Sequence, residues 1–158
     1  MQSADVTLRP ARRDDVAAIA ALLADDALGA KREDPGALDV YLAAFDEIAA
    51  QPGNQLVVAE RAGEPASEKI VGCLQLTVIP GLARRGVKRG QIEGVRVAAS
   101  CRGLGIGERL IRHAIELLRA AGCGLVQLTS DKSRNDAHRF YARLGFAASH
   151  EGFKLPLD

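Results

Sequence analysis

The sequence predicts an α/β (α+β) fold, in which a mixed and mostly antiparallel sheet of about seven strands packs against about four helices. Segments with strand-like alternation and segments with helical spacing of apolar residues follow one another in the order β-α-α-β-β-β-α-β-α-β-β. With 158 residues, of which 47% are hydrophobic, the chain has the length of one domain and can bury its own core. We therefore expect a single domain over residues 1–158.

The N-terminal third is expected to hold one strand and two helices. Residues 6–9 form an apolar and β-branched run that Pro10 ends. A helix follows from about Arg13, with an apolar stripe formed by Val16, Ile19, Leu22 and Leu23. A second helix is expected to start at Asp34 and Pro35, because aspartate is favoured as the cap and proline at the first helical position.

The middle of the chain predicts a hairpin, then a strand, a glycine-rich loop and a helix. A polar turn separates the strand-like runs at 55–60 and 69–79, which indicates antiparallel pairing. The strand at 91–98 leads into the loop, and the helix over 107–121 repeats apolar residues at helical spacing. Gly94 lies inside its strand, where glycine often marks a bulge or a close approach of backbones.

The C-terminal third is expected to add three strands and one helix. The strand at 125–130 follows a strand–helix crossover, so it should lie parallel to the strand at 91–98. A short helix is expected over 136–144, and a final hairpin over 146–149 and 153–157.

Charge and composition exclude several classes of partner. A net charge of +1 offers no electrostatic basis for binding nucleic acid or a membrane surface. No apolar run approaches the roughly 20 residues of a membrane-spanning helix, and the N-terminus lacks the basic start and apolar run of a secretory signal. The three cysteines are odd in number and widely spaced, which indicates a reducing cytoplasm and no metal site.

The loop at 102–107 has the composition of an anion site. Three glycines in five positions let backbone N–H groups approach a ligand, and the following helix directs its positive end to the same place. The natural ligand of such a loop is phosphate or pyrophosphate. The dinucleotide-binding pattern fails because Glu108 follows Gly107, and the Walker A pattern fails because no Lys-Ser/Thr pair follows. A tight turn that uses glycine for geometry alone is the alternative interpretation.

A second motif lies one helix and one strand downstream. It has Ala137, the pair Phe140-Tyr141, and the pair Gly145-Phe146, and the loop carries Arg102, Gly105 and Gly107 at the spacing Arg-x-x-Gly-x-Gly. In both motifs the chain resembles the GNAT superfamily of acyl-CoA-dependent N-acyltransferases, over essentially its whole length. The segment around Tyr141 also resembles that of aminoalkylphosphonate N-acetyltransferases, and residues 92–97, Ile-Glu-x-Val-x-Val, resemble a segment of glucosamine-phosphate acetyltransferases.

The resemblance implies a GNAT-like sheet with a central splayed parallel pair, and it implies acetyl-CoA as the acyl donor. In the family the loop holds the pyrophosphate, which assigns that role to Arg102, Gly103, Leu104, Gly105, Ile106 and Gly107. The backbone of Val95, Arg96 and Val97 should pair with the pantetheine arm in the gap between the two strands. Asn135 is a further contact to the coenzyme, although the family's asparagine usually stands one residue earlier, where this chain has Arg134.

Two residues are candidates for proton transfer. The family tyrosine, here Tyr141, donates a proton to the leaving thiolate, and a phenol with a pKa of ~10 is protonated at neutral pH. The acceptor amine must be neutral to attack, which costs on the order of 4–5 kcal/mol for an amine with a pKa of ~10.4. Glu93 is the candidate base, and a structural ion pair is its alternative role. Gln91 could bind the acceptor or water, and His138 and His150 are alternative bases.

The sequence thus predicts an N-acetyltransferase that acts on a primary amine, expected to be a small molecule, by direct attack in a ternary complex. A peptide or protein N-terminus is the alternative acceptor, and a non-catalytic acyl-CoA-binding domain is the alternative function. The basic loop at 81–90 is either a solvated loop or a flap that attracts an anionic group of the acceptor. A homodimer is expected from the family alone.

Overall fold

The structure is a computed structural model that describes residues 5–65 and 68–157. The chain forms two compact units, Met1–Gln127 and Leu128–Asp158. The expectation of one domain over the whole chain stays a prediction.

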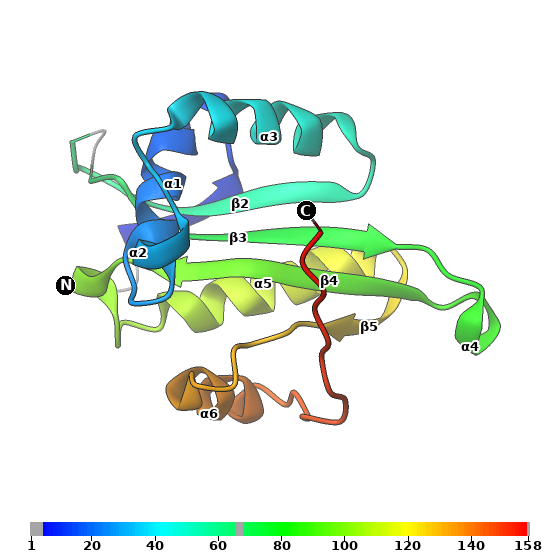
Figure 1. The fold of residues 1–158 in the computed structure, drawn as a ribbon. Helices are drawn as coiled ribbons and strands as arrows, with labels where there is room; N and C mark the ends of the chain where they lie inside the picture. Colours follow the sequence, from blue (N-terminus) through cyan, green and yellow to red (C-terminus); the bar gives the residue numbers. More distant parts are fainter. Residues whose placement is uncertain (1–4, 66–67, 158) are drawn as a thin grey trace. The chain divides into compact units, whose positions relative to one another are not determined.

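The first unit is built on a mixed sheet (Figure 1). Its strands, in their order across the sheet, are β1 (Val6–Pro10), β2 (Asn54–Arg61), β3 (Ile70–Ile79), β4 (Lys88–Val97) and β5 (Cys123–Gln127). Neighbouring strands are antiparallel except β4 and β5, which are parallel. The mixed and mostly antiparallel sheet is therefore confirmed, as is the parallel pair on either side of the glycine loop and its helix.

The number of strands differs from the expectation of about seven, because the described residues contain five. The expected hairpin over 146–149 and 153–157 is wrong: neither segment is a strand. Its alternating apolar side chains are exposed instead, at 94% for Phe153, 84% for Leu155 and 89% for Leu157. A segment with alternating apolar side chains forms a strand only where a neighbouring strand pairs with its backbone and one of its faces packs against the core. Among the described strands, the parallel pair consequently lies at the edge of the sheet and not at its centre.

Six helices occur among the described residues, where about four were expected. The longer ones are α1 (Val16–Ala24), α3 (Leu38–Ala50), α5 (Ile106–Ala120) and, in the second unit, α6 (Asn135–Arg143). The additional ones are the short turns α2 (Gly29–Arg32) and α4 (Ala83–Gly86). In α4, Arg84 and Arg85 adopt left-handed φ angles of 56° and 61°, so this segment is closer to an irregular turn than to a helix.

The expected capping of the second helix at Asp34 is wrong. Asp34 Oδ1 accepts a hydrogen bond from the Gly36 amide at 3.1 Å, and its carbonyl accepts one from the Ala37 amide at 2.9 Å. These bonds fold residues 34–37 into a turn, and α3 begins only at Leu38. An aspartate side chain can close such a turn as readily as it can cap a helix, which explains the difference.

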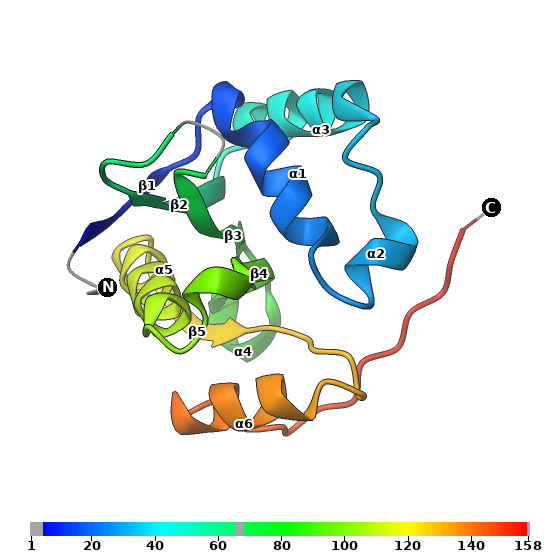
Figure 2. The same cartoon turned by 90° about the vertical axis from the view of Figure 1, so that its left-hand side faces the viewer.

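The two faces of the sheet are covered by different helices (Figure 2). α5 packs on one face with buried side chains that include Leu110, Ile111 and Leu118. On the other face, Ile19 and Leu22 of α1 form a cluster with Val58, Ile70 and Cys73, and α3 lies over β2.

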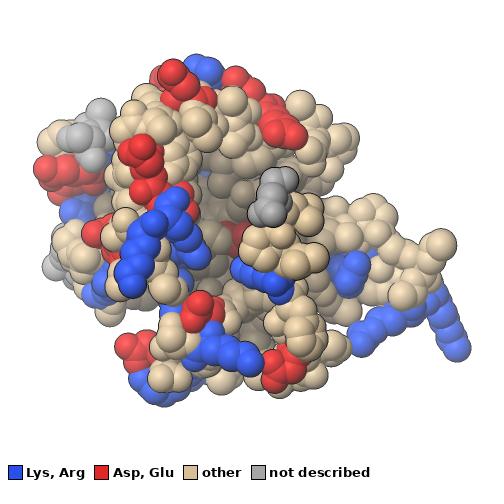
Figure 3. Space-filling view, in the orientation of Figure 1, with Lys and Arg blue, Asp and Glu red and all other residues tan. Residues whose placement is uncertain are grey.

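The segment between β3 and β4 projects beyond the sheet as an arm (Figure 1). Its side chains Leu82, Arg84 and Arg85 are exposed, and Figure 3 shows basic side chains gathered there. The arm contains residues 81–87 of the predicted basic loop at 81–90. The remaining residues, 88–90, belong to β4, because they pair with β3 and β5. The role of the loop in binding the acceptor stays a prediction.

Candidate functional site

β4 contains a bulge at Gly94, as the sequence predicts. Glu93 pairs with Gln75 and Arg96 pairs with Cys73, so that Gly94 and Val95 together oppose Leu74. Gly94 has a φ of 60°, a left-handed conformation that glycine adopts without strain. The Cys73 thiol donates to the Gly94 carbonyl at 3.6 Å.

The bulge resets which side chains share a face. Regular alternation would place Glu93, Val95 and Val97 on one side of the sheet. In the structure, Glu93 and Arg96 share the face of α1, whereas Val97 pairs with Gly72, whose Cβ position lies 3.0 Å from Leu110 Cδ1 of α5. The extra residue inserted by the bulge is the physical reason.

The pairing of β4 with its parallel neighbour β5 ends before the bulge. The ladder between β4 and β5 ends at Gln91 and Gln127, and the Gln127 Nε2 atom donates to Gln91 Oε1 at 2.8 Å. From residue 92 to Val97, β4 pairs only with β3 among the described strands. The backbone edge of Val95, Arg96 and Val97 is thereby open to an extended ligand, which could add to it as a strand does.

The glycine loop follows this open edge and ends at the N-terminus of α5. Gly103 and Gly105 have φ angles of 78° and 77°, and nothing lies within 4 Å of the Cβ position at either residue. The first helical bond runs from the Arg109 amide to the Gly105 carbonyl at 3.1 Å. The amides of residues 106–108 therefore form an open first turn, which no described side chain caps. This arrangement suits an anion.

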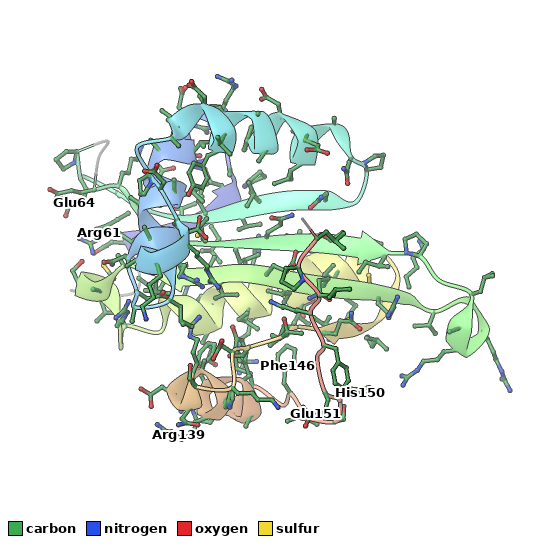
Figure 4. The ribbon with its side chains drawn as sticks, viewed as in Figure 1. Arg61, Glu64, Arg139, Phe146, His150 and Glu151 are labelled. Atoms are coloured by element: carbon green, nitrogen blue, oxygen red, sulfur yellow. The ribbon has the colours of Figure 1, made fainter. Side chains whose placement is uncertain are left out.

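Cys101 anchors the start of the loop. Its side chain is fully buried, and its sulfur accepts a hydrogen bond from an Nη2–H of Arg61. The other terminal nitrogen of Arg61 lies 3.2 Å from Glu64 Oε1 (Figure 4). Because this thiol is inaccessible, it is a structural contact of the loop and not a nucleophile.

Two arginines connect the donor segment to the turn that follows α1. Arg96 Nε lies 3.3 Å from Asp26 Oδ2, and the two side chains are only 10% and 19% exposed. Arg102 Nη2 donates to the Asp25 carbonyl at 3.4 Å. Arg96, predicted to act through its backbone, therefore uses its side chain to position the segment between α1 and α2.

Cys73 lies on the same face of the sheet as Arg96, but its thiol is unreactive. Burial raises the pKa of its thiol to about 12, and the nearby Arg96 lowers it only in part. The thiol is thus protonated at neutral pH and unsuited to nucleophilic or acid–base chemistry.

Glu93 is exposed on the face opposite α5. The adjoining Gly94 has its Cβ position 3.6 Å from Leu23 Cδ2, so the end of α1 lies beside this point of β4. The Glu93 carboxylate is therefore accessible and lies next to the edge of β4 that has no partner among the described strands. Its role as base stays a prediction.

Tyr141 and Asn135 lie in the second unit, on α6. The Tyr141 ring contacts Phe140 and Phe146 edge to face, with centroids 5.2 Å and 5.8 Å apart. Asn135 is the first residue of the helix, which confirms the predicted helix but not the coenzyme contact.

The alternative bases His138 and His150 also lie in the second unit. His138 Nε2 is 2.9 Å from the Asp131 carbonyl, and His150 Nδ1 is 2.7 Å from Ser149 Oγ. Figure 4 shows Phe146, His150 and Glu151 in this part of the chain. The structure thus assembles Glu93, the β4 edge and the loop within one unit, and the roles of Tyr141 and Asn135 stay predictions.

Several residues of this region were missed by reasoning from the sequence. Arg61 and Asp26 contact the loop and β4 from remote segments, and no local pattern marks them. Asn54, Gln75 and Thr77 form a hydrogen-bonded group: Gln75 Nε2 and Thr77 Oγ1 donate to Asn54 Oδ1 at 3.0 Å and 3.1 Å. The alternation within 69–79, which places Gln75 and Thr77 on one face, could have indicated this polar group.

Within 5–65 and 68–157, no helix combines the length and apolar character needed to cross a bilayer. Among these same residues, no three His, Cys, Asp or Glu side chains gather in a manner that could hold a metal ion.

Comparison with known proteins supports the predicted family. The model of the acetyltransferase (GNAT) family matches residues 17–146. A glucosamine 6-phosphate N-acetyltransferase from Trypanosoma brucei brucei is 33% identical over 130 residues, which cover 82% of this chain and 84% of the relative. An aminoalkylphosphonate N-acetyltransferase from Salmonella typhimurium is 42% identical over 68 residues, which cover 43% of this chain and 44% of the relative.

Solved structures show the same fold. A Bacillus halodurans protein described as a transcriptional regulator superposes with a TM-score of 0.89 and 45% sequence identity, covering 96% of this chain and 99% of that one. A Trypanosoma brucei acetyltransferase superposes with a TM-score of 0.76 and 31% sequence identity, and the match covers 97% of this chain and 100% of that one.

Proposed function

This chain belongs to the GNAT acetyltransferase family, and from that premise we propose that it transfers an acetyl group from acetyl-CoA to the primary amine of a small molecule. The observation that carries the proposal is the continuity between the open edge of β4 and the glycine loop at the N-terminus of α5. An extended ligand with a pyrophosphate at one end fits this continuous surface.

The residues present fit the coenzyme. Backbone groups of Val95, Arg96 and Val97 would pair with the pantetheine amides, in the manner of an added strand. The amides of residues 103–107 would hold the pyrophosphate, and each charge-assisted contact is typically worth ~1.5–3 kcal/mol. The Arg102 guanidinium adds positive charge at the loop. Bound acetyl-CoA would supply the activated acyl group as a thioester.

The chain's own acid–base groups account for the protons. Glu93, directly or through a water molecule, accepts the proton that the acceptor ammonium must lose before its nitrogen can attack. Formation of the N–C bond would break the C–S bond of the thioester, and Tyr141 would donate the proton that the leaving sulfur takes up. The nitrogen would lose its second proton as the amide forms, and that proton would restore the Tyr141 hydroxyl. The overall transfer converts an ammonium and a thioester into an amide, a thiol and one proton released to solvent. With Cys73 and Cys101 buried, direct transfer is favoured over a cysteine intermediate.

The small-molecule acceptor is supported by the relatives that are named for glucosamine 6-phosphate and aminoalkylphosphonate. A screen of small amines, with release of free coenzyme A thiol as the readout, tests the proposal. We expect stoichiometric thiol and N-acetylated amine with at least one phosphorylated or phosphonylated amine. Acetyl-CoA that fails to bind in a calorimetric titration would contradict the site.

A second candidate is a non-catalytic acyl-CoA-binding regulatory domain. It is supported by the 45% identity with the Bacillus halodurans protein described as a transcriptional regulator. The two functions differ in one measurement. The regulatory domain would bind acetyl-CoA and release no thiol with any amine or with peptide N-termini.

A further inference from the structure

We infer that one face of β4, from Arg89 through Gln91 to Glu93, forms an acceptor-recognition strip. It would select an amine whose body carries hydroxyl groups and whose far end carries a phosphate or phosphonate group. This inference rests on the proposed function and names the class of substrate at the same site.

The pairing of β4 with β3 places these three side chains on one face. Arg89, Gln91 and Glu93 occupy alternate positions, and the intervening Gly90 and Ile92 are buried. A Cβ at Gly90 would lie 2.5 Å from Leu118 Cδ1, so Gly90 faces α5. The three polar side chains therefore face away from α5, on the side of the sheet where the end of α1 reaches Gly94.

The strip has two distinct ends. Toward the loop it ends at the bulge, because the next residue on this face, Arg96, is committed to its ion pair with Asp26. Toward the arm it ends at the exposed Arg89. Glu93 consequently adjoins the open donor edge, and an amine held by its carboxylate is the group closest to that edge.

The two ends of the strip carry opposite charges, with a neutral side chain between them. Arg89 is a cation, Gln91 is neutral and Glu93 is an anion. Arg89 and Glu93 are four residue steps apart along the strand, which corresponds to about 14 Å between their Cα atoms. A zwitterionic ligand with its ammonium at Glu93 and its anionic group at Arg89 would match this order, and guanidinium groups favour phosphate-like anions.

Neutral hydrogen-bonding groups fill the surface between and beside the two charges. Gln91 is bonded to Gln127 at 2.8 Å, and Gln75 and Thr77, opposite Glu93 and Gln91, are bonded to Asn54. Whichever way the Gln91 and Gln127 side-chain amides are oriented, the two together keep hydrogen-bond donors and acceptors that a ligand can use. Such a surface binds hydroxyl groups, whereas the interior face of a sheet is ordinarily apolar.

Three amines test the strip: glucosamine 6-phosphate, glucosamine without the anionic group, and 2-aminoethylphosphonate without the hydroxyl groups. We expect the first to have the lowest KM. The Arg89→Gln variant should raise the KM for the phosphorylated sugar by about 10- to 100-fold, the usual value of a charge-assisted hydrogen bond. It should leave the KM values for glucosamine and acetyl-CoA unchanged. Gln91→Leu should raise the KM for both sugars and spare 2-aminoethylphosphonate.

Arg119→Gln is the matched control, since it removes an exposed arginine from α5, on the opposite face of the sheet from the strip. An equal effect of Arg89→Gln on phosphorylated and unphosphorylated sugar, or an equal effect of Arg119→Gln, would overturn the inference. Calorimetric titration with glucosamine 6-phosphate measures binding of the acceptor without acetyl transfer. It therefore distinguishes a failure of the strip from a failure of the proposed function. Binding that Arg89→Gln alone weakens supports the strip even without acetyl transfer, and binding that both variants retain contradicts it.

Discussion

Arg96 and Asp26 form an ion pair, with Arg96 Nε 3.3 Å from Asp26 Oδ2, that joins the bulged strand β4 to the turn after α1. Asp26 Oδ1 also accepts the Gly29 amide, so the same carboxylate shapes the start of α2. The pair therefore connects the predicted donor edge to a segment more than sixty residues earlier in the chain. The bulge at Gly94 makes this possible by turning Arg96 toward the face of α1.

Removing one partner of this pair should destabilise the fold. Asp26→Asn leaves the Arg96 charge uncompensated in a nearly buried position, which should lower the free energy of unfolding by on the order of 3 kcal/mol. Urea denaturation measures the change. Arg112→Gln, which breaks the exposed pair between Arg112 and Glu108, should cost about 0.5 kcal/mol or less. Similar losses for the two variants would contradict the role given to the buried pair.

Gly105→Glu should abolish acetyl-CoA binding, because a side chain at this residue enters the space where the pyrophosphate is expected. Gly63→Glu is a close control, since Gly63 has a φ of 80° against 77° for Gly105, and both have open space around the Cβ position. Both variants therefore pay a similar strain of about 1–2 kcal/mol. Calorimetric titration should detect lost affinity only for Gly105→Glu. Undiminished affinity in that variant would refute the pyrophosphate assignment.

Tyr141→Phe should lower kcat and leave the affinity for acetyl-CoA nearly intact, because only the proton for the leaving thiolate is removed. General acid groups typically contribute 10²–10⁴-fold. Tyr41→Phe provides the comparison, since the Tyr41 hydroxyl donates to Glu33 Oε2 at 2.8 Å on the periphery of the first unit. We expect it to have an unchanged kcat. A Tyr141→Phe enzyme as fast as the original would eliminate this tyrosine as the acid.

Stability should fall in acid through Asp15. Burial disfavours its carboxylate, but hydrogen bonds from Arg9 and from the Arg12 amide outweigh burial and lower its pKa. A depressed pKa in the folded state contributes stability above the unfolded value of about 3.9, and this contribution is lost as pH falls through the folded value. Thermal unfolding between pH 6 and about pH 2 should show a smaller loss for Asp15→Asn. An unchanged slope would contradict the contribution of Asp15.

Local patterns predicted most of the first unit. The alternation of β3, the helical spacing of α5 and the glycine inside β4 each report directly on backbone geometry, and the structure confirms all three. Two elements were predicted wrongly where a local signal admits two outcomes. Asp34 closes a turn instead of capping a helix, and residues 153–157 alternate like a strand but are exposed.

The face on which Glu93 lies relative to its neighbours could not be read from alternation alone. A bulge shifts every later side chain on β4 to the opposite face, and its extent depends on pairing with β3. The contacts of Arg61 with Cys101 and of Arg96 with Asp26 are equally invisible in the sequence, because each joins segments separated by tens of residues.

By itself, the sequence determined the family, the glycine-rich loop before α5 and the order of most elements, because glycines, helix starts and apolar periods act within a few residues of chain. The tertiary structure decided the rest. It set the point at which β4 parts from β5, the side toward which Arg89, Gln91 and Glu93 face, and the arginines that hold the loop in place. These properties depend on which strands pair and in what register, and pairing is settled only when distant segments pack together.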